Sequence, residues 1–394
     1  TVFASMAVLS LDPGLVPWQL RLWREVLPRH SGDCDGLFQA LAGSGAFREL
    51  WAQRHTRAPF LLPRLAFIEG GITLTDIARG LAEAAAKGDP IPAALGLVRG
   101  RSEKINSELP PVRAPPELEQ ALDFGTVFLN AASKRWPQLA AVCRAAGRAF
   151  RFPANINVYA TAPGRSVSTP AHADHHDVLI LQVQGEKRWR VYRPLPLANS
   201  DVHPCHRGKG DDTIDEAELG ECLVDVRLRQ GEVLFVPAGF VHATSTVGVE
   251  DCEDASLHLT LGLSVADCGL TLSTLLGQVL LELGEDSVLE EEEVDDESLW
   301  SLLEPLPLGC LAPASMHSPT ELCRHLADVI SGLARRRGAG AAADAVALEA
   351  AAGRVAERWL RIHEDLLEIY DQGYAEVAES ASGGTVAVGL ATRP

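Results

Sequence analysis

The spacing of apolar residues divides the chain into three parts. Apolar positions recur at helical intervals through 1–150, alternate with polar positions through 151–265, and return to helical intervals in 266–394. We therefore expect a mainly helical first region that packs on a central β-domain, and a helical last region. This pattern predicts a mixed α+β protein in which helices flank one strand-rich domain.

The alternating part contains several short strands separated by tight turns. The strands that we expect are 156–160, 178–183, 187–192, 223–228, 233–236 and 257–263. Turn residues separate several of them, including the glycines at 164, 185, 231 and 239. Short strands with tight turns favour an antiparallel barrel or double-sheet jelly roll over a parallel sheet. The mouth of such a barrel can hold a small ligand.

Near the end of the chain, 341–379 predicts a long helix with one apolar seam. The seam steps by four and three residues through Val355, Trp359, Ile362, Leu366 and Ile369. Two outcomes remain open: the seam packs on the barrel, or it packs on a second copy of the chain as a homodimer. The acidic run 285–297 is most simply a solvated loop.

Charge and cysteine content restrict the classes of partner and compartment. A formal net charge of −18 argues against nonspecific binding to nucleic acid or to an anionic membrane. The 8 cysteines are scattered without a C-x-x-C pair, as in an intracellular protein with reduced thiols, cytoplasmic or nuclear. No apolar run reaches the roughly 18–20 residues that a membrane span needs. Because the sequence begins at Thr1, we expect that the chain has been trimmed or processed.

The candidate chemistry begins at His172-Ala-Asp174, which precedes an apolar strand. In extended backbone, residues i and i+2 point to the same face, so one imidazole and one carboxylate can project together. His242 follows another apolar strand and its Pro237-Ala-Gly239 turn, and it can supply a second imidazole. An H-x-D motif or a lone histidine is a weak signal, but the combination fits the 2-His-1-carboxylate site of non-haem iron oxygenases. His175 and His176 remain alternative ligands or supporting groups.

Other polar residues have two interpretations from the sequence alone. Alternation places Lys187 on the face of Trp189 and Val191. An inward lysine needs an anion, because burial of an unpaired ammonium is costly, whereas an outward one is simply solvated. His258 either supports the site or packs as a core histidine. His203 and His206 flank a Pro-Cys pair in a polar loop, which is more typical of an exposed connection than of a metal cluster.

These motifs resemble the core of the cupin-like JmjC oxygenases, the group that includes the ribosomal oxygenases. The resemblance is specific over about 150–265 and faint beyond 270. It rests on His172-x-Asp174, on the strand 177–182, on Gly185-x-Lys187-x-Trp189-Arg-Val-Tyr192, on Pro237-x-Gly-x-x-His242, on 256–260, and on Asn157-x-Tyr159. A winged-helix module, which often ends proteins of that group, is not recognisable here.

The resemblance implies a double-stranded β-helix, or cupin, fold with Fe(II) held by His172, Asp174 and His242. It further implies dioxygen and 2-oxoglutarate as co-substrates, with Lys187, Asn157, Tyr159 and Thr260 lining the 2-oxoglutarate pocket. Hydroxylation of a C–H bond on a protein or peptide side chain, of a ribosomal or another basic protein, is the expected reaction. N-methyl-lysine demethylation, small-molecule hydroxylation and a non-catalytic metal-binding cupin scaffold, with zinc as one option, are the alternatives.

Overall fold

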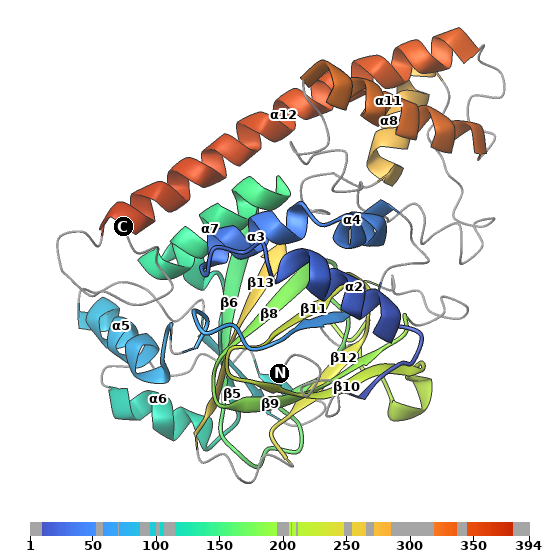
Figure 1. Ribbon diagram of the computed structural model, residues 1–394. Helices are drawn as coiled ribbons and strands as arrows, with labels where there is room; N and C mark the ends of the chain where they lie inside the picture. The colour runs from blue at the N-terminus through green and yellow to red at the C-terminus, as the bar shows by residue number, and fades with distance from the viewer. Residues whose placement is uncertain are drawn as a thin grey trace.

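The computed structural model describes residues 10–52, 58–69, 71–86, 95–99, 103–105, 115–194, 205, 207–209, 212–247, 254–264, 272–284, 319–336 and 345–380. In this part of the chain two antiparallel sheets form the lower half of the molecule, and helices cover the outer face of the larger sheet (Figure 1). The strands make two separate sheets rather than one closed barrel. The expected α+β jelly roll is confirmed.

The strands of the central region are divided between the two sheets. The smaller sheet has the order β1 (Ser10–Leu11), β10 (Cys222–Arg229), β9 (Glu186–Tyr192), β12 (His242–Ser245) and β7 (Thr169–His172). The larger has the order β2 (Phe60–Leu62), β11 (Val233–Val236), β8 (Asp177–Gln184), β13 (Ser256–Leu263), β6 (Ala154–Thr161), β5 (Thr126–Leu129), β3 (Leu95–Arg99) and β4 (Glu103–Ile105). From β7 to β13 the chain repeatedly crosses between the sheets, which brings residues distant in sequence to one end of the jelly roll.

Most of the helices precede or follow the jelly roll in sequence. They are α2 (Val16–Val26), α3 (Cys34–Ala42), α4 (Gly45–Ala52), α5 (Leu74–Ala86), α6 (Pro115–Leu122), α7 (Pro137–Phe150), α8 (Leu272–Leu283), α11 (Pro319–Arg336) and α12 (Ala345–Ser380), with the short 3-10 helices η3 (Ala132–Lys134) and η5 (Glu216–Glu218). Helix α7 begins at Pro137, where the missing N–H is no loss. No described helix combines the length and the apolar character that crossing a membrane requires.

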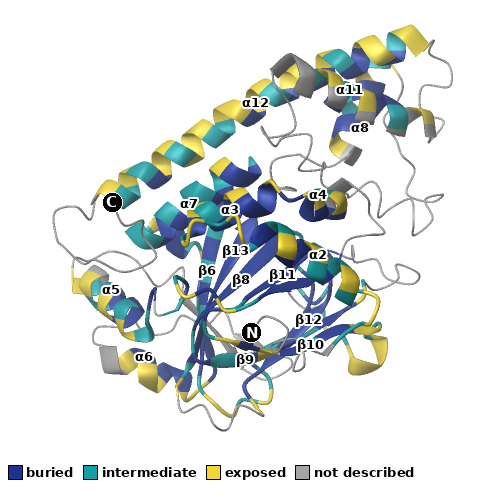
Figure 2. Cartoon of the chain, in the orientation of Figure 1, coloured by how far each residue is buried: buried dark blue, intermediate teal, exposed yellow. Residues whose placement is uncertain are grey.

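Both faces of the larger sheet are buried, but they contact different neighbours. Leu179 and Leu181 of β8 belong to the largest apolar cluster, which also contains the covering helices. Val178 and Ile180 alternate with them and belong to a second cluster between the sheets. Figure 2 shows the central strands as almost continuously buried. An uninterrupted apolar strand is expected when both of its faces are covered.

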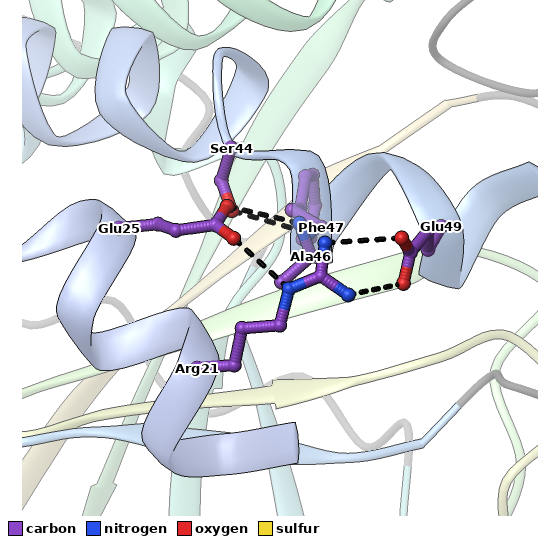
Figure 3. A network of polar contacts seen from close by, with 6 residues as sticks. All are labelled: Arg21, Glu25, Ser44, Ala46, Phe47 and Glu49. Atoms are coloured by element: carbon purple, nitrogen blue, oxygen red, sulfur yellow. Dashed lines mark hydrogen bonds and ion pairs between the residues drawn. The ribbon is translucent and has the colours of Figure 1, made fainter.

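A polar network fixes helix α4 against α2 (Figure 3). Glu25 accepts hydrogen bonds from the Ser44 hydroxyl at 2.7 Å and from the Ala46 N–H at 3.0 Å. Arg21 donates to Glu25 and, with two nitrogens, to Glu49. The network holds the start of α4 in place, so that Phe47 packs edge-to-face against Phe235 of β11.

The long C-terminal helix α12 lies along α7 and also contacts α8 and α11 (Figure 1). The predicted seam divides between two environments: Val355 and Trp359 are buried, whereas Ile362 and Ile369 are 59% and 65% exposed. In the second half of the helix, buried His363 contacts the carbonyl of Arg151 at the end of α7, and buried Tyr374 donates to Ala154 O of β6.

The region boundaries and the homodimer stay predictions. The 285–297 run, His203 and His206 lie outside the described residues.

Candidate metal centre

Two neighbouring strands bring the predicted imidazoles together. Strand β7 ends at His172 and β12 begins at His242, and the two residues face each other in the antiparallel ladder. Their ring centroids are 4.3 Å apart. Asp174 follows β7, and its backbone carbonyl accepts a hydrogen bond of 2.8 Å from the Gly239 N–H. One ligand atom from each of the three residues lies within 4.8 Å of the others, a grouping that includes neither His175 nor His176.

Hydrogen bonds to backbone carbonyls determine which imidazole nitrogen can bind a metal. His172 Nδ1 lies 2.8 Å from Pro170 O, and His242 Nδ1 lies 3.1 Å from Phe240 O. Because a carbonyl oxygen only accepts, each Nδ1 carries the proton and each Nε2 keeps its lone pair. Burial lowers the pKa of both imidazoles, so both are neutral at pH 7.

Asp174 supplies the negative charge of the cluster. Burial alone would raise the pKa of its carboxyl group, but Lys209, His172 and His242 together lower this pKa below its ordinary value. Its Oδ2 lies 3.5 Å from His242 Nε2. Two neutral nitrogens and one carboxylate match the donor set of a facial triad, so these residues fit a divalent metal such as Fe(II).

A buried lysine lies deeper between the sheets. Lys187 of β9 is fully buried, and its Nζ donates to Thr161 Oγ1 at 2.9 Å and lies 3.5 Å from His258 Nδ1. Burial lowers the pKa of Lys187 to about 7. No carboxylate of the described residues forms an ion pair with it. The inward orientation that alternation allowed is the one found, and within the described part of the chain the ammonium has no counter-ion.

The inner faces of β6 and β13 are polar around this lysine. Tyr159 stacks on His258 with centroids 5.1 Å apart and rings 4° from parallel. Asn157 accepts a hydrogen bond of 2.9 Å from the Ala131 N–H, and it pairs with Thr260 in the ladder. The other residues that the resemblance implied for the co-substrate pocket therefore lie on the inner face of the larger sheet, across from Lys187 on the inner face of the smaller sheet.

Trp189 lies near both the candidate metal ligands and the surroundings of Lys187, and one of its buried polar atoms has no partner among the described residues. The Trp189 ring lies 5.8 Å from the His242 ring and 5.2 Å from the His258 ring. Its Nε1 is buried and has no hydrogen-bond acceptor among the described residues. Such a donor indicates a polar ligand or water in the space between the metal ligands and the lysine.

Two neighbours of the site were not predicted from the sequence. Thr161 forms a buried hydroxyl cluster with Ser168 and Thr126, at 2.8 Å and 3.0 Å. The period of two along β6 places Thr161 on the face of Tyr159, so it could have been found. Lys209 forms an ion pair with Asp174. Nothing in the sequence pattern of its loop signals that contact.

Comparison with known proteins agrees with this geometry. The model of the JmjC domain family matches residues 133–267, which include all three candidate ligands and Lys187. This chain contains a JmjC domain. The domain covers β6 to β13 and the helix α7 behind them.

Similar curated proteins are much longer than the matched region. A bifunctional lysine-specific demethylase and histidyl-hydroxylase NO66 of Drosophila willistoni is 38% identical over 125 residues, which is 32% of this chain and 15% of that protein. Ribosomal oxygenase 1 of Homo sapiens is 33% identical over 172 residues, which is 42% of this chain and 24% of that protein. The chain thus spans about a quarter or less of the length of these relatives.

A similar solved structure is that of YcfD, a ribosomal oxygenase from Escherichia coli, in complex with cobalt and 2-oxoglutarate. It is 17% identical with a TM-score of 0.34, covering 70% of this chain and 67% of that one.

Proposed function

We propose that the JmjC domain of this chain is an Fe(II)- and 2-oxoglutarate-dependent oxygenase that hydroxylates a C–H bond on a protein or peptide side chain. The observation that carries the proposal is a fully buried Lys187, with no counter-ion among the described residues, on the same inner surface as a 2-His-1-carboxylate cluster. A scaffold that only binds a metal gives no reason for such a lysine, because an unpaired buried ammonium destabilises the fold.

The spacing along β9 supports a dicarboxylate as the missing group. His242 pairs with Val191, and Lys187 lies four residues further along the strand, roughly 13 Å away. A lysine side chain and a five-carbon diacid can together cover this span. One carboxylate would then meet Lys187 and Thr161, while the 2-oxo acid end would reach the metal ligands and pass the free Trp189 N–H.

Each group of the chain has a defined part in this scheme. His172 and His242 offer neutral Nε2 atoms, and Asp174 offers a carboxylate oxygen. When bound, Fe(II) together with the 2-oxo acid supplies the oxidising chemistry that activates dioxygen and then a C–H bond. Apolar side chains of the inner cluster, such as Val178 and Ile180, exclude water below the site.

The names of the relatives support a protein substrate. They describe a lysine-specific demethylase, a histidyl-hydroxylase and a ribosomal oxygenase. A net charge of −18 favours a basic partner such as a ribosomal protein. Hydroxylation adds one oxygen to the substrate, whereas demethylation by the same chemistry removes one methyl group, so the mass of a modified peptide separates the two.

The test is conversion of 2-oxoglutarate to succinate by the full chain with Fe(II). The wild type is compared with His172→Ala, Lys187→Ala and the surface control Arg188→Ala, because Arg188 pairs with Asp225 on the outer side of β9. We expect turnover in the wild type and the control, and loss in the two site variants. Failure of the wild type to bind either Fe(II) or 2-oxoglutarate would exclude the oxygenase.

A further inference from the structure

The two oxygens of the Asp174 carboxylate have different partners. Oδ1 accepts a hydrogen bond from the ammonium of Lys209, while Oδ2 lies 3.5 Å from His242 Nε2. The Lys209 side chain is 37% exposed and that of Asp174 19% exposed, so the pair closes one side of the cluster. One oxygen therefore faces the other candidate ligands and the second is already engaged.

The backbone beside Lys209 is fixed against the metal ligands. The Ala173 N–H, between His172 and Asp174, donates to Arg207 O at 2.9 Å. Gly208 has a φ of +70°, and a Cβ there would lie 2.6 Å from Ala171 O and 2.7 Å from His172 Cα. Only glycine permits this close approach.

Asp212 closes the same loop from its far side. Its Oδ2 accepts a hydrogen bond from Arg207 Nε at 3.0 Å, and its own N–H donates to Lys209 O at 3.1 Å. The contact between Lys209 and Asp174 is therefore supported by a loop built against the β7 end.

We propose that Lys209 is a positioning residue that holds Asp174 by Oδ1, so that only Oδ2 is offered to the metal. This inference rests on the proposed oxygenase. An octahedral metal with three protein ligands keeps three positions, and a chelating 2-oxo acid with dioxygen requires all three. A carboxylate that bound through both oxygens would occupy one of them. The ammonium on Oδ1 prevents this.

A competing explanation predicts the opposite effect on metal affinity. If the Lys209 ammonium only occupies the place of a cation, its removal frees the carboxylate and lessens repulsion of the metal, so binding tightens. If Lys209 orients the carboxylate, its removal weakens binding, because losing a group that orients a ligand lowers metal affinity by about 10- to 100-fold. The sign of the change decides between the two.

The experiment measures anaerobic Co(II) binding to the full chain, with Co(II) as the probe, together with its visible absorption spectrum. Lys209→Met removes the charge at similar length, Lys209→Arg keeps it, and Arg188→Met removes a surface cation paired with Asp225. We expect about tenfold weaker binding and an altered spectrum for Lys209→Met. Lys209→Arg should regain most of the affinity, and Arg188→Met should match the wild type.

Equal or tighter Co(II) binding by Lys209→Met would overturn the inference. His242→Ala separates that result from failure of the oxygenase itself. If the wild type binds Co(II) and His242→Ala does not, an unaffected Lys209→Met overturns only the role of Lys209. If the wild type binds no Co(II), the metal centre and the role of Lys209 both fall.

Discussion

The two faces of strand β13 differ more in chemistry than in burial. On the outer face, Leu257, Leu259, Leu261 and Leu263 are all 0% exposed and pack in the cluster that includes the helices. On the inner face, His258 and Thr260 are 2% and 9% exposed and face the polar pocket. A neighbouring strand repeats the pattern, because Val158 of β6 faces the helices and Tyr159 the pocket.

This difference separates the source of stability from the source of chemistry. Burial of apolar area on the outer face stabilises the strands, and the period of two then fixes where each inner side chain points. The inner face can therefore hold groups that do not stabilise the fold, with Lys187 as the extreme case. Changes to the outer face should lower stability without altering the site. Changes to the inner face should alter ligand binding with little effect on stability.

The largest expected effect is on stability, from a change to the outer face. Leu259→Ala should lower the free energy of unfolding by about 2–5 kcal/mol, since a fully buried leucine leaves a cavity in the apolar layer. The adjacent inner-face change Thr260→Ala should cost about 1 kcal/mol or less. Urea unfolding measures both, and Co(II) affinity in the absence of urea should stay the same in Leu259→Ala. If Leu259→Ala lowered the free energy of unfolding by as little as Thr260→Ala does, the division between the faces would be contradicted.

The second effect concerns Lys187 itself. Lys187→Met should weaken 2-oxoglutarate binding to the Co(II)-loaded chain by at least ~30-fold, because the distal carboxylate would be buried without a cation. Stability should stay equal or rise, since a buried unpaired ammonium is replaced by an apolar chain of similar length. Calorimetry with 2-oxobutanoate, which lacks the distal carboxylate, is the control and should show no change. If Lys187→Met weakened the binding of 2-oxoglutarate and 2-oxobutanoate equally, Lys187 would not contact the distal carboxylate.

The fold and the clustering of the three candidate metal ligands were predictable because strong local patterns encode them. Alternation of apolar residues predicted the jelly roll, and the i, i+2 spacing of His172 and Asp174 predicted one shared face. The sequence could not determine whether Lys187 points inward, since both faces of β9 carry polar and apolar residues. That choice depends on pairing with β10 and β12, which places Lys187 opposite Leu228 and on the inner surface.

Other features depended on contacts that sequence periodicity does not encode. Lys209 reaches Asp174 only because a loop folds back on β7. Within one chain, the buried stripe in the second half of α12 runs through His363 and Tyr374 rather than through Ile362 and Ile369, a division that apolar spacing alone does not encode.

A third effect links 2-oxoglutarate binding to pH. The pKa of Lys187 is lowered from its ordinary value to about 7, so the ammonium loses its proton as pH rises through 7 in the unliganded protein. Because the distal carboxylate binds the charged form, affinity should be constant below about pH 6 and fall above 7, roughly 20-fold between pH 6.5 and 8.5. Lys187→Arg should bind with little pH dependence, since a guanidinium stays charged.

2-Oxobutanoate serves as the control for this pH dependence. The pKa values of His172 and His242 are already lowered by burial, so metal ligation should not add a second transition in this range. If the affinity for 2-oxobutanoate fell by the same factor as pH rises, a group other than Lys187 would be the one that titrates.

The smallest effect distinguishes two threonines on adjacent inner strands. Thr161 accepts the hydrogen bond of Lys187 Nζ, so Thr161→Val leaves the ammonium less firmly placed and should weaken 2-oxoglutarate binding by about 1 kcal/mol, or fivefold. 2-Oxobutanoate should be unaffected by that change. Thr260 lies two residues along β13 from His258, the neighbour of Lys187, on the side toward the metal ligands.

If Thr260 lines the pocket as the resemblance implies, its hydroxyl would contact the 2-oxo acid group that 2-oxoglutarate and 2-oxobutanoate have in common. Thr260→Val should then weaken the binding of both compounds by a similar few-fold factor. Titration of the two variants with the two ligands gives four affinities. If Thr161→Val weakened only 2-oxoglutarate binding and Thr260→Val weakened the binding of both 2-oxo acids, Thr161 would lie at the distal carboxylate and Thr260 nearer the metal. If both variants showed the same selectivity, Thr161 of β6 and Thr260 of β13 would contact the same end of the co-substrate, and the inner face would not be divided between a distal end and a metal end.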